Sequence, residues 1–177
     1  MADCNPIINY SNGCSKSVVA GVQSLYLIGH KSLAPLSGST EVYGVGVNGM
    51  VNQIGLTGST KFAKIGILPK AVALKNPYAF DPTTGIAEHT EELTLPVSGV
   101  GVDSRKLVKS LVGQPIVSLL KLTDGTWLSQ GLDAMMYVTA IEGAVDGAAN
   151  SYTITFSGTS ADFTPIVDPT IVVGLTV

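Results

Sequence analysis

The chain has 177 residues, a formal net charge of −3, and only 13% charged residues. Its length suits one domain with a substantial core and is short for two domains. The acidic balance argues against a nucleic-acid-binding protein, because such proteins need a basic surface to neutralise phosphates. The sequence also lacks the roughly 20 consecutive apolar residues that cross a bilayer, so we expect no membrane contact.

The low proportion of charged residues bears on how the surface is used. Soluble domains average about 25% charged residues, whereas here 20 glycines and many serines and threonines take their place. A surface of small, uncharged residues suits burial against other copies of the same chain. We therefore expect a homo-oligomer, and a monomer with a neutral Ser/Thr surface is the alternative.

Residues 1–17 have no hydrophobic periodicity and contain Asn, Ser, Pro and Gly, which predicts an N-terminal arm. The first twenty residues lack the basic start and apolar run of a signal peptide, so we expect a cytoplasmic origin. Cys4 and Cys14 are then expected to be free thiols. Their spacing also allows a small disulfide loop, but two cysteines are too few for a zinc site with four ligands.

The first predicted strand covers 17–28 and is apolar on both faces near its end, which indicates a strand covered on both sides. In residues 41–60, glycines interrupt a series of valines, which predicts either a two-stranded ribbon with bulges or a flexible loop. The stretch from Gly44 to Gly49 matches the pattern G-x-G-x-x-G. A dinucleotide site needs a helix to begin there, and the following residues make a poor helix, so we reject that interpretation.

Two short strands are predicted next, at 62–68 and 72–74. The segment that follows contains Pro77 and Pro82 and is predicted to be a loop before Glu88.

Residues 88–156 carry clear signals at every boundary. The first strand is predicted from four residues spaced two apart: Glu91, Leu93, Leu95 and Val97. A helix is predicted at 104–112, with Asp103 as its N-cap and Gly113 just beyond its end. Leu107 and Leu111 share one face of this helix, and we expect them to pack on the sheet.

Four strands are then predicted, at 116–122, 126–132, 135–141 and 151–156. The dipeptide Asp124-Gly125 joins the first two as a hairpin, because Gly adopts the positive φ that such a turn requires. The predicted fold class is mainly β (α+β): an antiparallel β-sandwich or barrel-forming sheet with one short flanking helix, in a single domain that spans 1–177.

The C-terminal segment 165–177 is predicted to be an arm. Its apolar residues Ile171, Val172 and Val173 would be an aggregation hazard if they ended free in water. We expect them to add a strand to a sheet, in their own subunit or in a neighbour. Together with Val45, Val47 and Met50 of the Gly-rich stretch, they are the candidate assembly residues.

Few residues are candidates for chemistry. His30 and His89 stand far apart and in no metal-ligand pattern, and a lone His in a loop is usually solvated, so we expect no metal or catalytic role for His89. Glu91 and Glu92 would point to opposite faces of a strand, so they cannot act as one carboxylate pair. We expect neither an enzyme nor a cofactor nor a metal site.

The order of these segments resembles the tail tube proteins of tailed bacteriophages, and in particular small virion proteins of phages and prophages of the Bacteroidetes. The residues that carry the resemblance are Cys14 and those at 21–28, 91–95, 104–111, 124–127 and 150–158.

The resemblance implies a β-sandwich with one flanking helix, assembled as hexameric rings whose inner sheets form a β-barrel around a DNA channel. It implies rings stacked through an extended loop and terminal arms. The expected partners are other copies of the chain, other tail proteins, and genomic DNA that passes without specific binding. The expected location is the virion tail, after synthesis in the bacterial cytoplasm. Alternatives are a capsid decoration, tail sheath or tail terminator protein, or a non-viral β-rich binding module.

Overall fold

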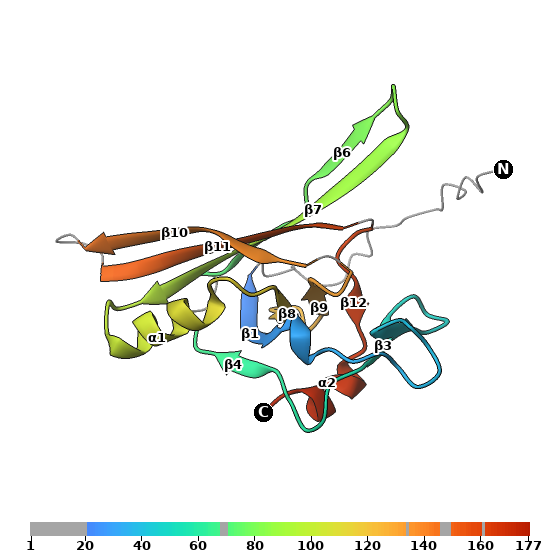
Figure 1. The fold of residues 1–177 in the computed structure, drawn as a ribbon, viewed down its shortest axis with the longest axis horizontal. Coiled ribbons are helices and arrows are strands. Elements are labelled where there is room, and N and C mark those ends of the chain that lie inside the picture. Colours follow the sequence, from blue (N-terminus) through green and yellow to red (C-terminus); the bar gives the residue numbers. More distant parts are fainter. Residues whose placement is uncertain (1–20, 68–70, 134, 146–149, 161) are drawn as a thin grey trace.

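The computed structural model describes residues 21–67, 71–133, 135–145, 150–160 and 162–177, which form two packed β-sheets with helices at their margins (Figure 1). One sheet has seven strands in the order β2-β3-β12-β9-β8-β1-β4. These are β1 (Val22–Gly29), β2 (Tyr43–Val45), β3 (Val51–Ile54), β4 (Ala63–Ile65), β8 (Ile116–Leu122), β9 (Trp127–Gln130) and β12 (Ile166–Val167).

The other sheet has five strands in the order β10-β11-β7-β5, and β6 also pairs with β7. These strands are β5 (Ala73–Lys75), β6 (Tyr78–Asp81), β7 (Ile86–Ser98), β10 (Tyr137–Val145) and β11 (Asn150–Ser160). The helices are α1 (Val102–Leu111), α2 (Pro169–Leu175) and the short 3-10 helix η1 (His30–Ser32). The predicted fold class, a mainly β sandwich of largely antiparallel sheets, is confirmed. Within the described residues neither sheet closes into a barrel.

The main core lies between the two sheets. Leu25 and Leu120 of the seven-stranded sheet pack with Leu93, Leu95 and Phe156 of the five-stranded sheet, and all five are fully buried. Because side chains alternate along a strand, burying this row turns the other row of each strand to the opposite face. The five-stranded sheet is therefore an amphipathic layer with one buried face.

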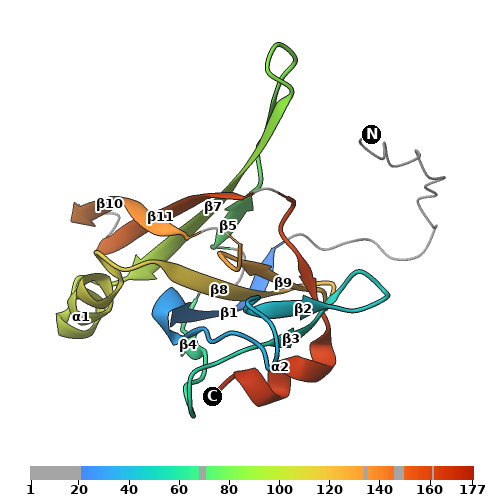
Figure 2. The same cartoon turned by 45° about the vertical axis from the view of Figure 1, so that its right-hand side comes forward.

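A second core covers the other face of the seven-stranded sheet. Val117 and Leu119 of β8 pack there with Phe62, and with Val172 and Leu175 of α2. The central strands are thus apolar on both faces, as predicted for the first strand, which begins at Val22 in the described part of the chain. The molecule consequently has three layers: the five-stranded sheet, the seven-stranded sheet, and α2 with adjoining loops (Figure 2).

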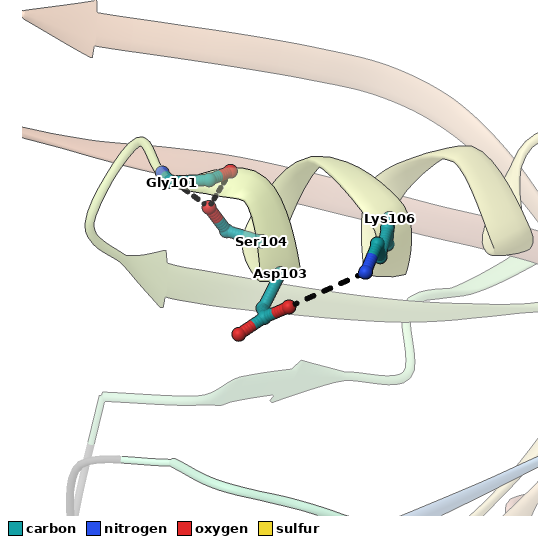
Figure 3. Close-up of polar contacts among 4 residues, drawn as sticks. All are labelled: Gly101, Asp103, Ser104 and Lys106. Atoms are coloured by element: carbon teal, nitrogen blue, oxygen red, sulfur yellow. Dashed lines mark hydrogen bonds and ion pairs between the residues drawn. The ribbon is translucent and has the colours of Figure 1, made fainter.

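The predicted helix is present, and its predicted contacts are confirmed. Leu111 is buried and Leu107 packs against the core between the sheets. The predicted N-cap, Asp103, is wrong, since α1 begins two residues earlier than predicted and Gly101 is the capping residue. The Ser104 hydroxyl accepts a hydrogen bond from the Gly101 N–H at 2.8 Å and donates one to the Gly101 carbonyl at 3.0 Å (Figure 3).

The C-terminal prediction is only partly right. Ile166–Val167 add strand β12 to a sheet of their own subunit, but Ile171, Val172 and Val173 lie in helix α2 and not in a strand. Asp168 caps α2 by accepting a hydrogen bond from the Thr170 N–H at 2.9 Å, and Pro169 occupies the first turn, where its missing N–H costs nothing. Beyond the helix, the Val177 N–H donates to the carbonyl of Phe62. The capping signal and the tertiary contact override the preference of β-branched residues for strands.

Two loop predictions resolve into hairpins. The Gly-rich residues 41–60 contain the antiparallel pair β2 and β3, with a register shift at Gly44, so the ribbon with a bulge is confirmed and the flexible loop is not. Strand β3, and not a helix, follows Gly49, which removes the dinucleotide interpretation. The segment predicted as a loop before Glu88 is instead the hairpin of β6 and β7. The predicted arm at 1–17, with Cys4 and Cys14, lies outside the described residues.

Replacement of Leu111 by Ala should lower the free energy of unfolding by roughly 2–5 kcal/mol, the usual range for a buried leucine. Lys109→Ala, on the exposed side of the same helix, is the control and should change it by less than about 0.5 kcal/mol. Urea denaturation followed by circular dichroism measures both. Equal midpoints for the two variants would contradict the packing of α1 on the core.

Val172 and Val173 provide a matched pair for testing whether α2 packs on the core of its own subunit, because they are adjacent valines with exposed fractions of 5% and 82%. Val172→Ala should lower the free energy of unfolding by about 1–3 kcal/mol through lost burial and a small cavity. Val173→Ala should leave it nearly unchanged. If both variants unfold at the wild-type denaturant concentration, α2 does not belong to the core of its own subunit.

Candidate assembly surfaces

The outer face of the five-stranded sheet is lined by small hydroxyl side chains. Its members face away from the core because their neighbours in each strand are buried. On β7 and β11 they are Thr90, Glu92, Thr94, Pro96, Ser151, Thr153, Thr155, Ser157 and Thr159. Most side chains on this face are small and polar, although Tyr137 of β10 lies opposite Ser157 and is 45% exposed.

The charges on this face are few. In the strand register, Glu92 on β7 lies opposite Lys75 on β5, and Glu142 on β10 lies opposite Thr153 on β11. Glu88 belongs to the same outward row of β7 and accepts a hydrogen bond from the Thr159 hydroxyl at 3.2 Å. Three carboxylates and one ammonium give the face an excess of negative charge. Since charge effects are screened within about 8–10 Å at physiological salt, the face would repel a polyanion only at short range. The described residues of this face form no basic track that could bind phosphates.

Both margins of this sheet are open among the described residues. β10 is the end strand on one side, and β5 and β6 follow one another along β7 on the other side. An end strand leaves a row of backbone N–H and C=O groups unpaired, which can accept a strand from another chain. The outer face therefore continues to two edges that can extend the sheet across copies.

The hairpin of β6 and β7 projects away from the rest of the molecule in both views (Figures 1 and 2). Every residue from Tyr78 to Glu88 is exposed, so the projecting part makes few contacts with its own chain. Tyr78, Phe80 and Ile86 are large apolar residues with more than half of their surface exposed. Exposed apolar side chains on a projecting element typically mark a contact with another protein.

The turn of this hairpin is held by its own side chains. The Asp81 carboxylate accepts hydrogen bonds from the Thr83 N–H and the Thr84 hydroxyl, both at 2.8 Å. Gly85 has φ of 71°, a conformation that favours glycine. At the base of the hairpin, the His89 ring meets Tyr78 at 4.8 Å and Phe163 at 4.2 Å between ring centroids. The hairpin is thus a shaped element with an anchored base.

A buried polar group lies between the sheets below the hairpin. Glu91 is only 2% exposed. Its carboxylate accepts hydrogen bonds from the Gly131 N–H at 2.7 Å and from the Thr164 hydroxyl at 3.2 Å. Burial raises the pKa of Glu91, as does nearby Asp133 to a lesser degree, while the two hydrogen bonds partly offset the effect. Glu91 links β7 to the end of β9 and to the segment that leads into β12.

The predicted assembly residues are split by the structure. Val45 and Val47 lie exposed on the ribbon of β2 and β3, whereas Met50 is half-buried. In α2, Val173 is exposed, but Ile171 and Val172 pack in the core of their own chain. The exposed members, Val45, Val47 and Val173, lie on different elements, and their role in assembly stays a prediction.

The histidines occupy positions without metal-site geometry. His30 begins η1, and His89 is buried in β7. Glu91 and Glu92 point to opposite faces, as predicted. Within the described ranges, no group of three His, Cys, Asp or Glu residues could hold a metal ion. No helix in this part of the chain is long and apolar enough to cross a membrane.

The sequence did contain a signal for the hairpin. Tyr78 and Phe80 are aromatic residues spaced two apart, and Ile86 follows the turn sequence Asp81-Pro82-Thr83-Thr84-Gly85. Alternating aromatics on one side of an Asp/Pro/Gly turn are typical of a hairpin. Pro77 and Pro82, which favour a loop, obscure this pattern in the sequence.

The comparisons with known proteins give no family assignment. No protein-family model, no curated protein and no solved structure matches this chain. The outer face and open edges of the five-stranded sheet and the projecting hairpin are therefore the features that bear on function.

Glu91→Gln should make stability less dependent on pH. Because the pKa of Glu91 is raised in the folded state from 4.5, its contribution is fully present below about pH 4.5 and is lost as pH rises through the folded-state pKa. The variant should equal the wild type near pH 4 and exceed it near pH 8 in urea denaturation. Glu92→Gln, on the outer face, is the control. A difference between Glu91→Gln and wild type that does not grow with pH would contradict a buried, charged Glu91.

Proposed function

We propose that this protein is the structural subunit of a bacteriophage tail tube, which polymerises as stacked rings around a channel for DNA. The observation that carries the proposal is the outer face of the five-stranded sheet: a largely Ser/Thr surface with more carboxylates than cations. A channel for DNA must not bind phosphates, and this face has the composition that such a lining requires.

The open margins of the sheet support the same proposal. A ring forms if β10 of one copy lies beside β5 and β6 of the next, so that the outer faces of successive sheets line one channel. This contact is heterologous, because two different edges meet, and a closed ring is the outcome when the rotation between copies closes. The order of segments along the chain adds the resemblance to tail tube proteins. On this proposal the protein functions in the virion tail, with other tail proteins as further partners.

The projecting hairpin supports assembly beyond a single ring. Tyr78, Phe80 and Ile86 expose large apolar side chains on this hairpin, where they make few contacts with their own chain. Such exposure typically marks a contact surface for another protein. The two ends of a ring must differ for rings to stack in one direction, and a hairpin on one side of the subunit provides such a difference. The low overall charge of the chain also favours burial of much of its surface between copies.

The test combines electron microscopy with thiol labelling in a Cys4→Ser, Cys14→Ser background. Purified protein should form rings or tubes in negative stain. Thr153→Cys, on the outer face of the five-stranded sheet, should react with a small maleimide in tubes but not with one that carries a long polyethylene glycol chain, because the channel excludes it. Ser59→Cys, on the exposed loop after β3, is the control and should react with both reagents.

Two results would contradict the proposal. A monomer at high concentration would favour a β-rich binding module, and a trimer would favour a capsid decoration protein. Equal reaction of Thr153→Cys with both reagents in assembled tubes would show that this sheet face lies outside, and would remove the channel assignment.

A further inference from the structure

Two exposed surfaces of opposite charge lie on opposite sides of the subunit. The hairpin of β6 and β7 projects from one side, and α1 lies on the other side in both views (Figures 1 and 2). The hairpin from Tyr78 to His89 contains two carboxylates and no lysine or arginine, a formal charge of −2. Helix α1 contains one carboxylate and three cations, a formal charge of +2. The two formal charges are equal and opposite.

The hairpin has two distinct faces, which the strand pairing defines. Tyr78 pairs with His89 and Phe80 with Ala87, so the aromatic side chains share one face. Ala79 pairs with Glu88, and Asp81 with Ile86. Asp81, Glu88 and the apolar Ile86 therefore share the other face, where they line a hollow with Ala79 and Thr84. We call this the acidic face of the hairpin.

The exposed side of α1 has a matching arrangement. A hollow there is lined by Val102, Arg105, Lys106 and Lys109. Val102 is largely exposed, although it is apolar. This basic face thus places cations around one exposed aliphatic side chain, as the acidic face places carboxylates around Ile86.

Neither surface is neutralised by other described residues of its own subunit. Among the described residues the only ion pair joins Lys106 to Asp103 at 3.8 Å, within α1 itself (Figure 3). Arg105 and Lys109 form no ion pair in this part of the chain, and neither Asp81 nor Glu88 has a cationic partner there. The hairpin cannot reach α1 of its own chain, because the two lie on opposite sides of the molecule.

We propose that the acidic face of the hairpin docks on the basic face of α1 of a second copy of this chain. Ile86 would meet Val102 at the centre, with the carboxylates beside Arg105 and Lys109. The contact joins two different surfaces, so it propagates from copy to copy without closing on a pair. Complementary charge at such a contact selects the partner and speeds association more than it adds affinity.

This inference deepens the proposed function, on which it rests for its place in the assembly: it is the contact between successive rings. Exposed ion pairs are individually weak and are screened by salt. A ring, however, presents one such contact from every subunit at once, and linked weak contacts act together. One hairpin contact can therefore be too weak to join two free subunits, while the full set of contacts joins two rings.

The test exchanges the charges across the contact. Glu88→Lys and Lys109→Glu are used singly and together, because Asp81 holds the turn of the hairpin and must be kept. Each single variant should raise the protein concentration needed for stacking about tenfold, since an attraction becomes a repulsion. The double variant should return it to the wild-type range. Lys31→Glu, an exposed lysine on η1, is the matched control and should have no effect.

Light scattering, sedimentation and negative-stain microscopy report stacking and ring formation separately. Raising salt from about 0.05 M to about 0.5 M should shorten wild-type stacks. Intact rings that fail to stack in each single variant, with stacking restored in the double variant, support the contact. Stacking of both single variants at the wild-type concentration, or no recovery in the double variant, would overturn it while leaving the ring proposal standing.

Two further outcomes distinguish this docking contact from the tube proposal and from binding to nucleic acid. If the wild type forms no rings but associates head to tail, and the charge exchange breaks and restores that association, the contact is supported and the tube proposal fails. If instead Lys109→Glu abolishes binding to double-stranded DNA while stacking is unchanged, the basic face of α1 serves nucleic acid, and the docking proposal is overturned.

Discussion

The rest of the structure depends on β7, which buries one row of side chains in the core and turns the other row to the surface. Its inward row, from Glu91 through Leu93 and Leu95, is buried against the seven-stranded sheet. That burial fixes the register of the strand, because a shift of one residue would bring the outward Thr and Glu side chains into the core. The outward row is thereby committed to the surface. The Ser/Thr face of the sheet is the necessary counterpart of the hydrophobic core.

The same strand sets the position of the projecting hairpin. β7 extends beyond the sandwich towards Ile86, where it pairs only with β6. The transition is marked by His89, the last buried residue before the exposed part, whose ring packs with Tyr78 and Phe163. Just inside it, Glu91 ties β7 to the end of β9. The buried carboxylate is costly to desolvate, but it joins the two sheets at the base of the hairpin.

The proposed assembly divides its contacts by type. Backbone hydrogen bonds between open sheet edges would hold the ring, and these are insensitive to salt. Charge complementarity between the hairpin and α1 would hold successive rings, and this contact weakens as salt rises. Such a division lets rings form before stacks. It also explains why a chain with few charged residues places three of its cations on one short helix.

By itself, the sequence determined the elements whose local signals agree with their burial. The strand Ile116–Leu122, the hairpin at Asp124-Gly125 and the helix with Leu107 and Leu111 all follow from periodicity and turn chemistry. The paucity of charge likewise indicated a surface of small polar residues. It could not indicate which strands carry that surface, because the faces of a strand are assigned only when its partners are known.

Tertiary structure decided the conformation of the C-terminus and the surroundings of His89 and Glu91. Ile171 to Val173 favour a strand locally, but the Asp168 cap and the docking of Val172 against the second core make them helical. Glu91 looks like any polar residue in an alternating strand until Gly131 and Thr164, distant in sequence, enclose it. Contacts between residues far apart in the chain supply the free energy that overrides local preference, and no local pattern records them.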